Sequence, residues 1–199
     1  MLLHFPLAVR PAVAALWTID ETLAAVVAEA TQPALAAIKL AWWAEALARL
    51  DTAPPPPEPR LQAVADTLIV AGVRGAEVAE LEEGWAALLD EHPEPARGAG
   101  RGRALLAIEA RLLEANDPHL PAAGAVFALT DARRRGCPAM DQALAEYRLQ
   151  LAGWRVPRAL RPITLTTRLA LRPPAEPEGT PARALALIAH RLTGRLPLL

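Results

Sequence analysis

The sequence predicts an all-α protein, and three observations lead to this expectation. Alanine and leucine dominate a chain that is 53% hydrophobic and only 4% aromatic, and both residues favour helices because they lose little side-chain freedom there. The β-branched alternation that is typical of strands occurs only in residues 163–169, ITLTTRL. Prolines divide the rest into segments of helical length, and 199 residues suffice for one sizeable core.

Nine helices are expected in order along the chain, several of them beginning at a proline. In the first one, Leu16, Ile19 and Leu23 recur at the spacing of one helix face, which predicts that this face packs into a core. The expected ranges are 12–30, 33–50, 59–70, 75–91, 101–115, 118–135, 140–151, 157–171 and 181–195.

Connectors between these helices are short. The proline-rich run at 53–59 (APPPPEP) predicts an extended loop, and two further breaks lie at 91–100 and at 172–180, before the last helix. Glycine and arginine alternate in residues 97–103 (RGAGRGR), which lack the ending of a phosphate-binding loop and are expected to form a flexible connection. None of the connectors is long enough to separate domains, so residues 1–199 are expected to form a single domain.

Charge is distributed unevenly along the chain, although the net charge is only −1. Residues 1–119 carry 9 basic and 17 acidic groups, whereas residues 120–199 carry 12 basic and 5 acidic groups. Either the two parts attract each other, or the basic part faces an anionic partner such as a lipid headgroup, a diphosphate or a nucleic acid. Nucleic acid is disfavoured because the pI is about 6.4 and few aromatic residues stand among the basic ones.

Cysteine and histidine give no indication of a metal site. A single cysteine, Cys137, cannot form an intramolecular disulfide, and His4, His92, His119 and His190 show no ligand spacing. The amino terminus lacks the basic start of a signal peptide, and no stretch reaches the roughly 18 uncharged apolar residues of a membrane-spanning helix. The expectation is a cytoplasmic protein without a metal, with contact to a membrane surface left open.

Asp20 is the first candidate site residue. By helical geometry it lies at the edge of the apolar face of its helix, where a carboxylate needs a hydrogen-bond partner or an ion because burying it alone is costly. One interpretation is a half-exposed aspartate paired with an arginine. The other is a ligand position, either working or vestigial.

Tryptophans and one arginine form the second group of candidates. Trp17, Trp42 and Trp85 either pack in the core or line an apolar cavity for a hydrocarbon chain. Trp42 is followed directly by Trp43, which points about 100° away, so the two rings cannot fill one pocket. Arg134 lies at the end of a predicted helix, where it either complements the helix dipole or contacts an anionic headgroup or diphosphate.

Several segments, in their order along the chain, resemble the squalene/phytoene synthase family. The most specific of them is a tryptophan pair that is followed by an acidic residue and then by a proline loop. Together the segments cover about the first two thirds of the sequence. They are 15–27 (ALWTIDETLAAVV), 37–51 (AIKLAWWAEALARLD), 59–68 (PRLQAVADTL), 81–90 (LEEGWAALLD) and 124–134 (GAVFALTDARR).

This resemblance implies a helical bundle of the isoprenoid synthase type, shortened here, in which two prenyl diphosphates are condensed head to head. In that family two aspartate-rich motifs on facing helices hold Mg²⁺ and a diphosphate. Here Asp20 is followed four residues later by Ala24, and Asp131 is followed four residues later by Arg135. Both acid pairs are therefore incomplete, as in degenerate members such as an assembly factor of mitochondrial respiratory complex I.

Three hypotheses follow for the function. The first is a catalytically degenerate protein that binds an isoprenoid, a lipid or a protein partner through an apolar helical cavity, without a cofactor. The second is an active prenyltransferase in which Asp20, Asp131 and nearby arginines manage the diphosphate with Mg²⁺. The third is an interaction protein whose bundle has no cavity. They differ in whether the two aspartates face each other across an apolar cavity.

Overall fold

Helices make up the regular structure of the computed structural model, which describes residues 2–173, 176–177 and 179–196. The described part contains no strand, and its one β-bridge joins Arg155 to Arg195. The prediction of an all-α fold is thus confirmed. The α-helices are α1 (Arg10–Ala28), α2 (Pro33–Arg49), α3 (Pro59–Val64), α4 (Gly75–Ala79), α5 (Leu81–Ala86), α6 (Pro95–Leu112), α7 (Leu120–Arg134), α8 (Asp141–Gln150), α9 (Leu165–Ala170) and α10 (Pro181–Thr193).

Prolines begin four of these helices, α2, α3, α6 and α10. The first N–H of a helix has no partner within the helix, so a proline at this position loses no hydrogen bond. Side chains cap two of the same helices. The Glu58 carboxylate accepts from the backbone N–H of Leu61, and the Thr180 hydroxyl accepts from that of Arg183.

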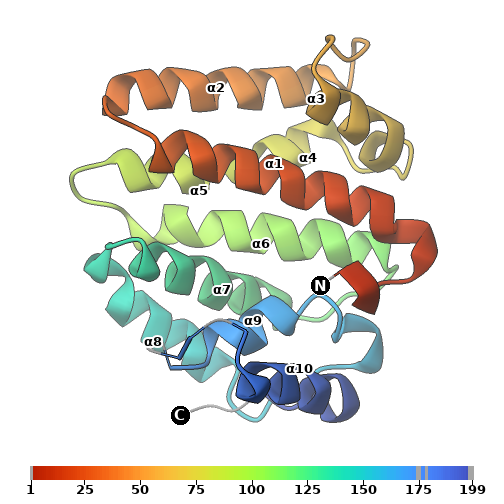
Figure 1. Ribbon diagram of the computed structural model, residues 1–199, viewed down its shortest axis with the longest axis vertical. Coiled ribbons are helices and arrows are strands. Elements are labelled where there is room, and N and C mark those ends of the chain that lie inside the picture. Colours follow the sequence, from red (N-terminus) through yellow and green to blue (C-terminus); the bar gives the residue numbers. More distant parts are fainter. Residues whose placement is uncertain (1, 174–175, 178, 197–199) are drawn as a thin grey trace.

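The helices are stacked with α6 in the middle of the molecule (Figure 1). On one side α5, α1 and α2 follow, and on the other side α7 packs on α6 and is in turn covered by α8 and α9, with α10 against α9. Large apolar side chains fill the space between the central helices. Those without any exposed surface include Leu16, Ile19, Leu23, Trp85, Leu105, Leu106 and Leu129.

The glycine-rich residues 97–103 are helical, so the prediction of a flexible loop there was wrong. They belong to α6, which begins at Pro95 rather than at Arg101. Glycine is unfavourable in an isolated helix, but here it permits a close crossing of α6 and α7. A Cβ on Gly102 would lie 1.9 Å from the carbonyl oxygen of Gly124, which leaves no room for any side chain.

Two other predicted helices are interrupted. The expected helix 75–91 is interrupted at Glu80, between α4 and α5. Gly75 packs against Leu47 of α2, and Gly84 packs against Arg101 of α6. The expected helix 157–171 is reduced to a short turn at Arg158–Leu160 and to α9. Pro162 lies between these two pieces, and a proline inside a helix removes a hydrogen bond and clashes with the preceding turn.

One segment, Leu7–Ala28, is long and apolar enough to cross a membrane by length and composition, with a mean hydropathy of 1.4 over its most apolar window. Most of it is α1, whose Leu16, Ile19 and Leu23 are fully buried against the other helices. Core helices of soluble proteins pass the same test, so this segment is weak grounds for a membrane span.

Two alanine substitutions in α6 test the helix crossing. We expect Gly102→Ala to lower the free energy of unfolding by about 1–3 kcal/mol because the new methyl group has no space between α6 and α7. Gly100→Ala is the matched control, since the nearest atom to its Cβ is 3.9 Å away. It should raise stability by about 0.5–1 kcal/mol through helix propensity. Urea unfolding measures both, and equal effects would contradict the crossing.

Candidate functional site

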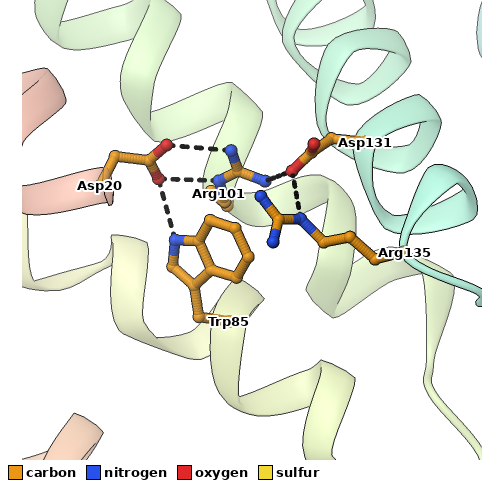
Figure 2. Close-up of polar contacts among 5 residues, drawn as sticks. All are labelled: Asp20, Trp85, Arg101, Asp131 and Arg135. Atoms are coloured by element: carbon orange, nitrogen blue, oxygen red, sulfur yellow. Dashed lines mark hydrogen bonds and ion pairs between the residues drawn. The ribbon is translucent and has the colours of Figure 1, made fainter. Parts of the chain in front are cut away.

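Asp20 is buried in the middle of the molecule, with only 3% of its surface exposed. Its Oδ1 accepts hydrogen bonds from Nε1 of Trp85 at 2.9 Å and from Nε of Arg101 at 2.7 Å, and its Oδ2 accepts from Nη2 of Arg101 at 2.9 Å (Figure 2). The predicted arginine partner is therefore present. The predicted half-exposure was wrong, because the carboxylate lies inside the core rather than at its edge.

Arg101 joins Asp20 to Asp131. Its Nη1 donates to Oδ2 of Asp131 at 2.8 Å, and the same oxygen accepts from Nε of Arg135 at 3.1 Å (Figure 2). The two aspartates that the sequence singled out thus face each other from α1 and α7. A guanidinium whose side chain is only 5% exposed fills the space between them. We call Asp20, Arg101, Asp131 and Arg135 the central cluster.

Aromatic rings pack against the two guanidinium groups. The Cζ of Arg101 lies 3.9 Å from the ring centre of Trp85 and 5.2 Å from that of Phe127. The Cζ of Arg135 lies 4.8 Å from the ring centre of Trp85. Cations at such distances are attracted to the negative face of a ring, and the attraction increases where water is excluded. Trp85 therefore contributes both an N–H to Asp20 and a ring face to the arginines.

The central cluster is electrically balanced, because two carboxylates oppose two guanidinium groups. Burial disfavours the charge on Arg101, but the attraction and hydrogen bonds of Asp20 and Asp131 outweigh burial and raise the pKa of Arg101 above its ordinary value. Among the described residues, no three His, Cys, Asp or Glu side chains come together in a way that could hold a metal ion. Together with Trp85 of α5, the central cluster is suited to fixing α1, α5, α6 and α7 relative to one another.

Glu109 is a second buried acid, and it was not among the predicted site residues. Its Oε1 accepts from Nε1 of Trp17 at 2.7 Å, while its Oε2 is buried without a hydrogen-bond partner. Burial raises the pKa of Glu109 to about 8; the hydrogen bond from Trp17 opposes this shift, and the charge of Asp20 adds to it. Trp17 thus contacts a second acid close to the central cluster.

The remaining candidates lie away from the central cluster. Trp42 is 50% exposed on α2, where its ring meets Trp43 edge-on with centres 5.1 Å apart. It lines an open hollow of about 260 Å³ together with Arg49 and Pro54. Arg134 is exposed in the last turn of α7. The structure therefore brings together Asp20, Asp131, Trp85 and the unpredicted Arg101, but not Trp42 or Arg134.

Fold and site define an all-α protein in which a balanced ionic cluster joins α1, α6 and α7 and is hydrogen-bonded to Trp85 of α5. Comparisons of the chain with family models, with curated proteins and with solved structures find no match.

Asp20→Asn tests the central cluster. We expect it to lower the free energy of unfolding by about 3–5 kcal/mol, because it leaves the buried Arg101 with one carboxylate in place of two. Arg97→Gln is the control: it removes two contacts to Glu83 and Asp90 that lie at the surface. Such pairs contribute about 0–1 kcal/mol. The double variant with Asp20→Asn and Arg101→Met should lose less free energy of unfolding than the sum of the two single variants. The reason is that removing both partners leaves no unpaired charge in the core.

Glu109→Gln tests the buried acid through the pH dependence of stability. The folded-state pKa of about 8 is above the ordinary value of 4.5, so the folded protein keeps this proton longer than the unfolded chain does. Wild-type stability should therefore fall as pH rises between about 4.5 and 8, with this group contributing up to about 1.4 kcal/mol per pH unit. Glu109→Gln should remove this contribution, whereas Glu45→Gln at an exposed position should not. Urea unfolding at several pH values measures the difference.

Proposed function

We propose that this chain is a non-catalytic protein built like the squalene/phytoene synthases that it resembles, and that it acts by binding a partner at its surface. One observation supports this proposal above the others. Arg101 lies between Asp20 and Asp131 and is hydrogen-bonded to both. A cation supplied by the chain itself thus occupies the space that a metal ion would need.

Ionisation of a prenyl diphosphate requires that the leaving charge be neutralised, as Mg²⁺ ions held by carboxylates do. Both oxygens of Asp20 already accept hydrogen bonds, from Arg101 and Trp85. A magnesium ion would be repelled by Arg101 and would have to break a buried ion pair. A diphosphate would be repelled by the two carboxylates, and the balanced cluster offers no surplus positive charge to hold it.

The packing of the centre favours a binding surface on the outside rather than in an interior cavity. Trp85 has no exposed surface and belongs to the same hydrophobic core as the fully buried leucines of α1 and α6. A hydrocarbon chain would have to displace these side chains. The exposed face of α2, with Leu35, Ile38 and Trp42, and the exposed face of α10 instead offer apolar contacts that are already accessible. An isoprenoid, a lipid or an apolar protein segment are the partner classes that such faces suit.

The alternative is an active prenyltransferase, and one observation favours it: Asp20 and Asp131 do face each other from two helices (Figure 2). This function would require Arg101 to leave its place so that Mg²⁺ could enter. Gly84 packs directly on the base of the Arg101 side chain, since a Cβ on this glycine would lie 2.4 Å from the Cβ of Arg101. The close contact with α5 opposes such a movement.

A turnover assay separates the two functions. The purified protein is incubated with Mg²⁺ and farnesyl or geranylgeranyl diphosphate, and we expect no released diphosphate and no rise in Tm on adding Mg²⁺. Asp131→Asn is the informative variant because this carboxylate is partly exposed, with 24% of its side chain accessible, and Arg101 keeps its two hydrogen bonds to Asp20. Turnover that Asp131→Asn abolishes and Arg97→Gln retains would overturn the proposal.

A further inference from the structure

Helix α10 presents its apolar side to solvent. Its outward positions recur at helical spacing, and none of them is polar. By contrast, the polar residue His190 is buried, together with Ala186, on the side that faces the protein. Leu185, Ile188 and Leu192 are 64%, 54% and 73% exposed. The exposed set is Pro181, Ala182, Ala184, Leu185, Ile188, Ala189 and Leu192.

Polar contacts fix α10 in this orientation. His190 Nε2 lies 2.8 Å from the hydroxyl oxygen of Thr164, and its Nδ1 lies 3.1 Å from the carbonyl oxygen of Arg195. Nη1 of Arg161 donates to the carbonyl oxygens of Arg191 and Leu192 at the end of the helix. The apolar face of α10 is therefore held outward by specific bonds, and turning it inward would break them.

Exposed leucines continue this surface at the amino terminus. Leu3 and Leu7 are 82% and 77% exposed in the segment Leu2–Val9. The residues between them, His4, Phe5 and Pro6, line one open hollow of about 870 Å³ together with Arg158, Arg191 and Leu192. The two apolar regions therefore adjoin at this hollow, and arginines lie at its edge.

Positive charge accompanies the apolar face. Residues 155–196 contain eight arginines and two glutamates, and α10 itself contains no acid. Among the described residues, Arg101 to Asp131 is the one ion pair that joins residues 1–119 to residues 120–199, and there the earlier part supplies the base. In the part of the chain that the structure describes, the acids of residues 1–119 therefore form no ion pair with the arginines around α10.

We propose that α10 and the segment Leu2–Val9 dock on an anionic lipid bilayer. The leucines and Ile188 enter the boundary between headgroups and acyl chains, while Arg158 and Arg191 contact lipid phosphates. A helix with a fixed apolar face beside arginines is the arrangement that binds in the plane of such a surface. This docking rests on the proposed function: the protein is proposed to bind a partner at its surface, and the docking names that partner as an anionic membrane.

A second copy of the chain is the other occupant of an apolar face. In a symmetric dimer through α10, however, the same patch meets itself, so Arg158 and Arg191 of each copy would approach those of the other. Like charges at such a contact oppose association. An anionic membrane covers the same apolar area and neutralises the arginines, so the charge favours lipid.

Vesicle co-sedimentation tests the docking, with phosphatidylcholine alone and with added phosphatidylglycerol. We expect wild-type protein to prefer the anionic vesicles by about tenfold or more, and added salt to weaken the binding. Leu185→Gln with Leu192→Gln should reduce binding by about tenfold or more. The control is Val70→Gln with Leu149→Gln, whose side chains are also exposed and lie outside α2 and α10. It should bind as wild type does.

The arginines have a matched control of their own. Arg158→Gln with Arg191→Gln should abolish most of the preference for anionic vesicles. Arg49→Gln with Arg74→Gln, at exposed positions distant in sequence from α10, should keep this preference. All four variants alter residues that are not fully buried, and their Tm values establish that they fold.

Three results would overturn the docking: no binding of wild type to either vesicle, equal losses in the α10 variant and in Val70→Gln with Leu149→Gln, or no preference for anionic lipid. A dimer in size-exclusion chromatography that Leu185→Gln with Leu192→Gln dissociates, without vesicle binding, would assign the face to a second copy instead. The turnover assay contains no vesicles. Its outcome decides the proposed function alone, and failed docking leaves that outcome unchanged.

Discussion

Burial of the Asp20 carboxylate is the constraint around which the structure is arranged. An isolated charge in a core is too costly to persist, so a cation must be brought to it and held there. Arg101 meets this need only because glycines let the neighbouring helices approach α6 closely, Gly84 from α5 and Gly124 from α7. Asp131 and the ring of Trp85 then complete the surroundings of the guanidinium (Figure 2).

Much of the fold could be predicted from local sequence. Proline positions and helical apolar spacing indicated most helix starts and the inward face of α1, because both depend on residues close together in the chain. The start of α6 could not be predicted this way. Local propensity favours a loop for residues 97–103, and the packing that makes them helical comes from Gly124 in another helix. Tertiary contact here overrides the local preference.

The candidate site was predictable to a smaller degree. Asp20 and Asp131 stood out by their positions, and an arginine partner for Asp20 was expected from the cost of burying an acid. The identity of that partner was hidden, since Arg101 is 81 residues from Asp20 and 30 from Asp131. The position of Glu109 could have indicated a second buried acid. It lies four residues after the apolar Leu105, so both fall on the same face of the helix. Once α6 is extended to Pro95, both Arg101 and Glu109 fall on its buried side.

The separation of Asp20 from Arg101 also governs the order in which the protein can assemble. During synthesis α1 and α2 emerge before any of α6 exists, and domains form as their residues become available. Until Arg101 follows, 81 residues later, Asp20 has no cation to accompany it into the core and stays hydrated. The opening pair of helices can collapse on its apolar side, but it reaches its final packing only after α6 arrives. Completion of the core is therefore a late, non-local step of folding, even though the protein is built from local helices.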